Sequence, residues 1–503
     1  MNAASSGVGG AGAGGSVASS STGGSGGGLP EAGPSPDANG DDGSAPDATG
    51  PDAGPPPVVS APALPCTDTI ANVYIPPANL PPLTLTTRGD VVRCAPDTDL
   101  PLVTVVNEVV AKGVMTPMQT AVNLFRIAYR TTRGNGSDGI SSARVYLPAQ
   151  PTKLPLPVIV VGHPTDGIAA SCAPSQDLTS NEDLALPWAG LGYAVIVPDY
   201  AGLGTPGVQG YLDNRDQGYS ILDGARALRK LLPANALSEQ VLAVGWSQGG
   251  GAVLSAQALA PTYGVDGTLA GVVVFAPEWP SRLNSFGYVN ELNAPPKTLT
   301  ITTGISEDVV AVMMMYAYFG NYVGMSDVGD GFPAARQAGM DNAVNTLCQT
   351  PLGAYLQANE FYVTDIFDPT FQATTLACIN AAEGLDAGDG LDGGDGGPGC
   401  VDPGLSFYTY LKHNILTANP NGPPMLFVQG LQDVIMPPGT EGACNLVKLE
   451  ADGVTPQLCT DSAASHTDVV GRNMDFAIPW ALAALGGTPL PTCSAAGMPA
   501  CTP

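Results

Sequence analysis

Short runs of apolar residues, rich in Val and Ile, alternate with longer segments of helical character over much of the chain. Parallel strands that are covered on both faces show such continuous apolar runs, because neither face is exposed to water. The alternation therefore predicts an α/β fold, with a mostly parallel central sheet and helices on both of its faces. The predicted strands cover 157–161, 194–198, 241–244, 271–275 and 425–428.

Two further patterns predict a hairpin beside these strands and two of the helices between them. Residues 125–132 and 143–147 are predicted to be strands of a hairpin, because the Gly- and Asn-rich segment 134–139 between them favours a turn. Residues 220–232 and 248–259 are predicted to be helices, and Pro261 is expected to stop the second one.

The alternation breaks between Phe275 and Met425, where the interval is far longer than a simple crossover needs. We interpret residues of about 280–422 as a cap or lid inserted above the carboxyl-terminal edge of the sheet, where open α/β sheets carry their active sites. Within it, residues 309–319 are expected to form an apolar helix. That helix is either the packed core of the cap or, through its methionines, a surface for alkyl chains. Residues 385–399 are expected to be flexible.

The first 62 residues contain mainly Gly, Ser, Ala, Pro and Asp, and cannot bury enough apolar surface to offset the entropy of ordering. They predict a disordered tether (1–62), followed by a catalytic domain (63–490) and a short tail (491–503). No signal peptide is recognisable after Met1, so export would need a signal upstream or one already removed. We nevertheless expect a protein that is secreted or tethered at a bacterial cell surface.

Charge narrows the range of partners. The chain has 18 Lys and Arg against 45 Asp and Glu, which gives a net charge of −27. Such a surface repels nucleic acids and anionic headgroups. No apolar run is long enough for a transmembrane segment. We therefore expect no nucleic acid as a partner, and expect any contact with lipid to be apolar rather than electrostatic. The oligomeric state is left open.

The chain has ten cysteines, no Cys-x-x-Cys pair and three histidines, which favours disulfides formed in an oxidising compartment over a structural zinc site. Four pairs lie close together in the sequence and are the expected bonds, although spacing alone does not determine the connectivity. They are Cys66–Cys94, Cys378–Cys400, Cys444–Cys459 and Cys493–Cys501, and the last would be a local bond of the tail.

The pentapeptide Gly245-Trp-Ser-Gln-Gly249 matches G-x-S-x-G. A second match at 23–27 lies in the predicted tether and lacks structural context. Ser247, by contrast, follows a predicted buried strand and opens a predicted helix. At such a turn a serine takes strained backbone angles and exposes its hydroxyl group, so Ser247 is the candidate nucleophile.

A serine hydroxyl needs a base, and histidine has a suitable pKa. In α/β folds that carry the serine on such a strand-to-helix turn, the acid and then the base follow the serine along the chain. His163 precedes Ser247 and is interpreted as a structural loop residue. His413 lies before the last predicted core strand and is interpreted as a cap or surface residue. His466, which lies beyond that strand, is the candidate base.

Asp433 is the candidate acid, since it follows the strand 425–428 and can accept a hydrogen bond from the imidazole Nδ1 of His466. The alternatives are Asp199, which precedes the serine, and Asp461 and Asp468, which are too near the histidine in sequence for easy alignment.

A tetrahedral oxyanion needs preorganised donors. The amide of Gln248, at the start of a helix, is one candidate. The other is expected in the loop after the first core strand, at Asp166 or alternatively at Thr165.

Several of these motifs resemble the secretory lipase family of α/β-hydrolases, including its bacterial members, over about residues 115–485. They are Thr165-Asp-Gly, Cys172-Ala-Pro-Ser, Pro198-Asp-Tyr-Ala-Gly, the Ser247 pentapeptide, and Asp433 and His466 in that order. The resemblance implies a capped α/β-hydrolase fold, a role for Asp166 in the oxyanion hole, and a bond from Cys172 to the cap, here to Cys348. It also implies hydrolysis of acylglycerols or simpler esters without metal or organic cofactor.

The sequence thus predicts a secreted serine hydrolase of carboxylic esters. The alternatives are a polyester or peptide hydrolase with the same triad, or a tethered binding protein without catalysis. Asp386, Asp389, Asp392 and Asp395 could suggest a calcium site, but a solvated linker is the preferred interpretation.

Overall fold

The computed structural model describes residues 59–151, 154–177, 182–283, 307–359, 366–383 and 398–502. Most of the predicted tether lies outside these residues, and so do Asp386, Asp389, Asp392 and Asp395 of the predicted linker. Val59, at the start of the described chain, is already buried in the core.

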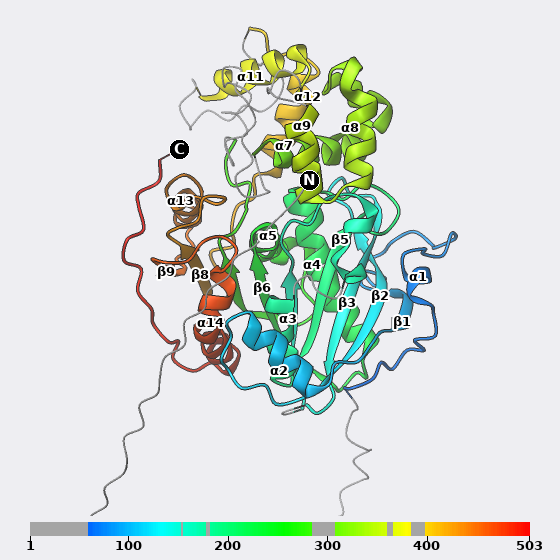
Figure 1. Ribbon diagram of the computed structural model, residues 1–503, viewed down its shortest axis with the longest axis vertical. Coiled ribbons are helices and arrows are strands. Elements are labelled where there is room, and N and C mark those ends of the chain that lie inside the picture. The colour runs from blue at the N-terminus through cyan, green and yellow to red at the C-terminus, as the bar shows by residue number, and fades with distance from the viewer. Residues whose placement is uncertain are drawn as a thin grey trace, which may run out of the picture. The chain divides into compact units, whose positions relative to one another are not determined.

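A nine-stranded sheet forms the centre of the fold (Figure 1), in the order β1-β2-β3-β5-β4-β6-β7-β8-β9. Its first four strands pair antiparallel and the remaining pairs are parallel. The predicted mostly parallel sheet and its hairpin are therefore confirmed. The strands are β1 (Val91–Pro96), β2 (Val122–Thr132), β3 (Asp138–Pro148), β4 (Leu156–Gly162), β5 (Ala194–Ala201), β6 (Leu237–Trp246), β7 (Thr268–Phe275), β8 (Met425–Gly430) and β9 (Gln457–Asp461).

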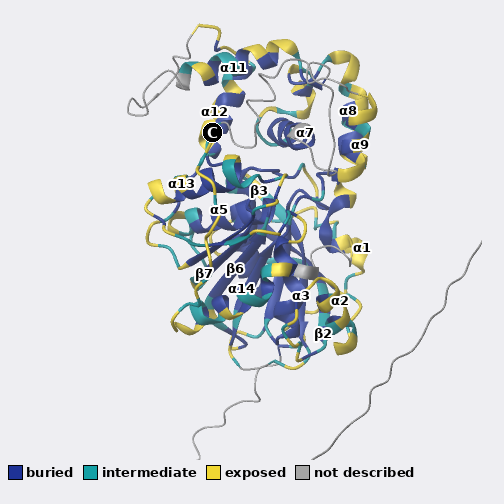
Figure 2. Ribbon diagram, turned by 60° about the vertical axis from the view of Figure 1, so that its left-hand side comes forward, coloured by how far each residue is buried: buried dark blue, intermediate teal, exposed yellow. Residues whose placement is uncertain are grey.

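Helices cover both faces of this sheet, as the continuous apolar strands require. Along β4, Val158 and Val160 belong to the hydrophobic cluster that includes α4 (Asn214–Leu231) and α5 (Gln248–Tyr263). The alternate residues, Ile159 and Val161, belong to the cluster on the other face. That cluster includes α2 (Leu102–Ala111), α3 (Glu182–Gly190) and α14 (Val469–Gly486). In Figure 2 the strands are accordingly buried along most of their length.

Two predicted helix boundaries are wrong. Helix α4 begins at Asn214 rather than 220, because the Asp213 carboxylate caps it by accepting from the amides of Arg215 and Asp216. Helix α5 continues past Pro261 to Tyr263 and ends before Gly264, whose φ is 84°. Proline disrupts a helix mainly through the residues before it, so one further turn can follow it.

The described residues between β7 and β8 form a group of helices that lies at one end of the sheet (Figure 1). Helix α7 covers the predicted apolar segment except its last residue, Phe319, which begins η4. This helix is buried in the same cluster as the sheet face, including Met313, Met314 and Met315. We call this group the cap. It comprises α7 (Glu307–Tyr318), η4 (Phe319–Val323), η5 (Met325–Asp330), α8 (Ala334–Thr346), α9 (Gln349–Asn359), α11 (Pro369–Glu383) and α12 (Gly404–Asn414).

All ten cysteines form disulfides. Cys66–Cys94, Cys172–Cys348 and Cys378–Cys400 are as expected. The other two expected pairs are wrong, because the bonds are Cys444–Cys501 and Cys459–Cys493.

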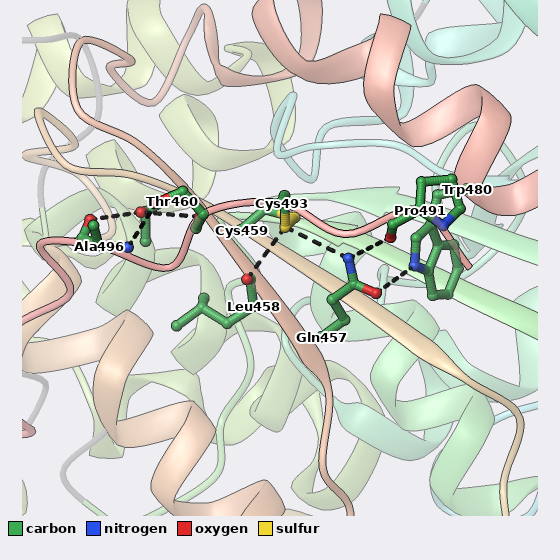
Figure 3. The surroundings of a disulfide bond; sticks show 9 residues. Gln457, Leu458, Cys459, Thr460, Trp480, Pro491, Cys493 and Ala496 are labelled. Atoms are coloured by element: carbon green, nitrogen blue, oxygen red, sulfur yellow. Dashed lines mark hydrogen bonds between the residues drawn. A yellow bond between two sulfur atoms is a disulfide. The ribbon is translucent and has the colours of Figure 1, made fainter. Parts of the chain in front are cut away.

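The tail therefore carries no local disulfide of its own. The tail runs beside β9. The amide of Thr460 donates to the carbonyl of Ser494. The side-chain amide of Gln457 donates to the backbone carbonyl of Pro491 (Figure 3). One cysteine bond ties it to β9 and the other to α13 (Ala443–Ala451). The tail thereby covers a sheet edge whose backbone groups would otherwise be open to pairing.

Among the helices that the structure describes, none is both long and apolar enough to cross a bilayer.

Candidate active site

Ser247 lies at the sharp turn between β6 and α5, with φ 54° and ψ −124°. This is a strained conformation for a residue with a side chain. Neighbouring backbone holds it in place: the amide of Ser247 donates to the carbonyl of Phe275 (3.0 Å), and the amide of Glu278 donates to the carbonyl of Ser247 (2.8 Å). The end of β7 thus supports the predicted nucleophile from the adjacent strand.

The glycines of the pentapeptide permit this turn to approach the neighbouring strand. A Cβ atom on Gly249 would lie 2.0 Å from the carbonyl oxygen of Gly162, at the end of β4. Only glycine fits there. The motif is therefore a steric requirement of the turn as well as a sequence pattern.

His466 comes from the loop between β9 and α14 and reaches both other members of the predicted triad. Its Nε2 atom lies 3.0 Å from the Oγ atom of Ser247, and its Nδ1 atom lies 2.8 Å from Oδ2 of Asp433. Each of the three residues is only 3% exposed. The structure therefore brings the three sequence-predicted residues together in one buried chain of hydrogen-bonding groups.

Asp433 lies in the loop after β8, and that loop orients its carboxylate. Its Oδ1 atom accepts from the amides of Ile435 (2.9 Å) and Met436 (2.8 Å), which leaves Oδ2 directed at the imidazole. A carboxylate held in this way fixes the ring so that Nε2 faces the serine.

The three alternative aspartates are bonded elsewhere. Asp199 accepts from Ser142 and Ser175, Asp461 pairs with Arg472, and Asp468 accepts from Ser465.

The predicted oxyanion donors come from two different elements. The amide of Gln248 is the first in α5 and has no acceptor within the helix. Thr165 and Asp166 lie in the loop after β4 (residues 163–167), which we call the oxyanion loop after the donor that the sequence predicts there. The cap contacts this loop, because the amide of Gln349 donates to the Asp166 carbonyl (2.8 Å) and the Cys172–Cys348 bond lies beside it.

His163 supports the same loop. Its fully buried ring lies against Tyr200, with 4.4 Å between the ring centroids, and its Nδ1 atom lies 3.2 Å from Oδ2 of Asp166. Burial opposes protonation of the ring, but the hydrogen bond and charge of Asp166 outweigh it and raise the pKa of His163 above its ordinary value. The ring contacts the oxyanion loop and β5, in agreement with the structural role that the sequence predicts for His163.

His413 lies in the last turn of α12, in the cap. It lines a cavity of about 680 Å³ together with aromatic residues that include Tyr318, Tyr322 and Tyr410. Partial burial and the nearby Arg215 guanidinium lower the pKa of His413.

Sequence reasoning missed one buried acid beside Ser247, the predicted nucleophile. Glu278 is 4% exposed, and its carboxyl oxygens lie 3.3 Å from Oγ1 of Thr165 and 3.4 Å from the hydroxyl of Tyr211. Burial, with a smaller contribution from the Glu441 carboxylate, raises the pKa of Glu278 to about 8. A signal was available in the sequence, since Glu278 follows the apolar run 271–275 at the edge of the sheet where the site was expected.

In the part of the chain that the structure describes, no three His, Cys, Asp or Glu side chains are grouped as metal ligands would be.

Comparison with protein families adds an independent finding. Residues 179–279, which include the turn at Ser247 but neither Asp433 nor His466, match the model of the secretory lipase family. This match confirms the resemblance that the motifs indicated. Among curated proteins, none matches the chain.

Solved structures with the same fold include lipase A from Candida antarctica in its closed state, at 18% identity and a TM-score of 0.56, with 88% of this chain and 90% of that chain covered. The rice cell wall degrading esterase LipA from Xanthomonas oryzae aligns at 17% identity and a TM-score of 0.55, with 79% of this chain and 95% of that chain covered. A putative hydrolase from Legionella pneumophila aligns at 17% identity and a TM-score of 0.55, with 77% of this chain and 96% of that chain covered. These likenesses confirm the α/β-hydrolase fold.

Proposed function

We propose that this chain, a carboxylic ester hydrolase that resembles the secretory lipases, cleaves acylglycerols or simpler acyl esters through a covalent acyl-enzyme on Ser247. The observation that carries the proposal is the position of the His466 ring between the Ser247 hydroxyl and the Asp433 carboxylate. A weak nucleophile, a base and a group that orients the base are what two-step acyl transfer needs.

In the first step the Oγ atom of Ser247 forms a bond to the ester carbonyl carbon while Nε2 of His466 takes the hydroxyl proton. The Asp433 carboxylate, which accepts from Nδ1, stabilises the imidazolium that results. The negative charge that develops on the carbonyl oxygen is stabilised by the amide of Gln248 and by an amide of the oxyanion loop, at Asp166 or Thr165. His466 then protonates the departing alcohol.

In the second step a water molecule attacks the acyl-enzyme. His466 takes a proton from this water and returns one to Ser247, and the carboxylic acid is released. Every proton transfer uses the same imidazole, so no metal or organic cofactor enters the scheme.

The five disulfides support an oxidising compartment as the place of action, because such bonds rarely persist in the cytosol. We propose that the enzyme is secreted, in agreement with the family that its central segment matches.

The test is hydrolysis of p-nitrophenyl esters from acetate to palmitate by wild-type protein, Ser247→Ala and the matched control Ser462→Ala. Ser462 is exposed and lies in the loop before His466. We expect turnover by wild type and control, and a loss of at least about 10³-fold in Ser247→Ala. A phosphonate ester should modify Ser247, as intact mass and peptide mapping would show. Turnover that survives in Ser247→Ala would refute the proposal, and the preferred acyl length separates a lipase from a short-chain esterase.

A further inference from the structure

The carboxyl group of Glu278 connects the two structures that are proposed to stabilise the oxyanion. Through its backbone amide, Glu278 bonds to the carbonyl of Ser247 (2.8 Å). Through its carboxyl group, it reaches Thr165 of the oxyanion loop and the buried Tyr211. One residue therefore contacts both the turn that carries the nucleophile and the loop expected to carry the second donor.

The position of Glu278 is fixed by close packing. A Cβ atom on Gly251, in the first turn of α5, would lie 1.9 Å from the carbonyl oxygen of Glu278. The Thr165 and Tyr211 hydroxyls also lie 3.1 Å from each other, so the three polar groups form a closed triangle. Tyr211 and Thr165 are themselves buried, so the triangle has little contact with bulk water.

Three hydroxyl-bearing groups satisfy one another when the carboxyl is neutral, because each can donate one hydrogen bond and accept another. The surroundings favour that form. The charged group that acts most on Glu278 among the described residues is the Glu441 carboxylate, which is itself paired with Arg282. Tyr211 stays neutral, since burial raises its pKa well above the ordinary value. His163 and Asp166 of the oxyanion loop pair with each other.

We propose that Glu278, as a neutral carboxylic acid, is a positioning residue that sets the spacing between the Ser247 turn and the oxyanion loop, and so the geometry in which the two amide donors meet the substrate oxygen. The inference rests on the proposed acyl transfer at Ser247 and adds a residue that acts on it through Thr165.

Loss of the proton from Glu278 would disturb this arrangement in two ways. Thr165 and Tyr211 would both have to donate to the carboxylate, which breaks the triangle. The new buried charge would also oppose the negative charge that develops on the substrate oxygen. Because the pKa of Glu278 is about 8, activity should fall as the pH rises through that value.

The test compares kcat and kcat/KM from pH 6 to 10 for wild type, Glu278→Gln and Glu278→Leu, with spontaneous ester hydrolysis subtracted. For wild type we expect a decline centred near pH 8. Glu278→Gln keeps the shape and two hydrogen-bonding atoms but cannot ionise, so its kcat should fall by less than about fivefold and the decline near pH 8 should disappear. Glu278→Leu should lose more than about tenfold in kcat, with KM changed less than about twofold, because the oxyanion exists only in the transition state.

A further variant, Glu441→Gln, removes the neighbouring charge that raises the pKa of Glu278 and should move the decline to lower pH. The inference is wrong if wild type hydrolyses esters through Ser247 but shows no decline near pH 8, or if Glu278→Gln retains that decline. Glu278→Gln alone decides the question if Glu278→Leu does not fold. Absence of wild-type turnover, or turnover that does not depend on Ser247, would instead refute the proposed function.

Discussion

The Nε2 atom of His466 lies 3.0 Å from the Oγ atom of Ser247, although 219 positions separate the two residues along the chain. Parallel strands of one sheet bring the two residues together. Ser247 follows β6, Asp433 follows β8 and His466 follows β9, and all of these strands end at the same edge of the sheet. Because the loops start at the same edge, they can bring a hydroxyl, an imidazole and a carboxylate together.

Asp433→Asn should reduce kcat by about 10³-fold or more and leave KM within a few fold. The amide cannot stabilise the imidazolium, and it can turn the ring into the tautomer that leaves Nε2 protonated. Steady-state hydrolysis of a p-nitrophenyl ester measures both constants. The matched control is Asp461→Asn, which breaks an ion pair with Arg472 in the same region but touches no reacting group. Equal losses in the two variants would contradict the role proposed for Asp433.

Gly249→Ala should reduce both activity and stability. The added Cβ would meet the carbonyl oxygens of Gly162 at 2.0 Å and His163 at 2.7 Å, and neither backbone atom can move without displacing the oxyanion loop. We expect a loss of more than about 2 kcal/mol in the free energy of unfolding and of more than about 100-fold in kcat. Gly486→Ala, in the last turn of α14, is the control, because its nearest neighbour would be 3.8 Å away. Denaturant titration and ester hydrolysis test both, and wild-type behaviour of Gly249→Ala would contradict so close an approach of the turn to the end of β4.

Asp213 should make stability depend on pH. Burial, together with the charge of Asp216, raises the pKa of Asp213 from 3.8 to about 6. The native state therefore binds this proton more tightly than the unfolded chain, and the contribution to stability is lost as the pH rises from about 4 to about 6. Asp213→Asn removes this loss and can still cap α4. Its free energy of unfolding should exceed that of wild type by about 1–3 kcal/mol at pH 7 and equal it near pH 4.

The control for this effect is Asp213→Ala, which also removes the ionisable group but loses the cap that accepts from Arg215 and Asp216. It should be less stable than Asp213→Asn by about 1 kcal/mol at every pH. If chemical denaturation finds Asp213→Asn less stable than wild type at neutral pH, the buried charge is better compensated than its pKa indicates.

The C-terminal disulfides can be distinguished by peptide mapping without reduction. The expected cross-linked peptides join Cys444 to Cys501 and Cys459 to Cys493. The paired variant Cys459→Ser/Cys493→Ser opens a loop with a sequence separation of 34 and should cost about 3–4 kcal/mol. Thermal unfolding with and without reductant measures the loss. Recovery of peptides that join Cys444 to Cys459 would overturn this connectivity.

Local pattern was sufficient for the parts of the fold that depend on neighbours in sequence. Continuous apolar runs predicted the strands of the parallel sheet, because burial on both faces leaves no polar alternation. Short strands with polar residues were missed, as at β9 (Gln457–Asp461), since nothing in their composition separates them from a loop. The early start of α4 was missed too, although Asp213 was a readable cap signal.

The sequence by itself determined the turn at Ser247, because the glycines around it are needed for one specific local conformation. It also predicted the order of serine, acid and base, and with that order the choice of His466 among three histidines. Only the tertiary structure decided which cysteines in the last 60 residues pair, and that a glutamate after β7 meets a threonine after β4. Both depend on which strands lie side by side, and spacing along one chain does not specify distances between segments that folding brings together.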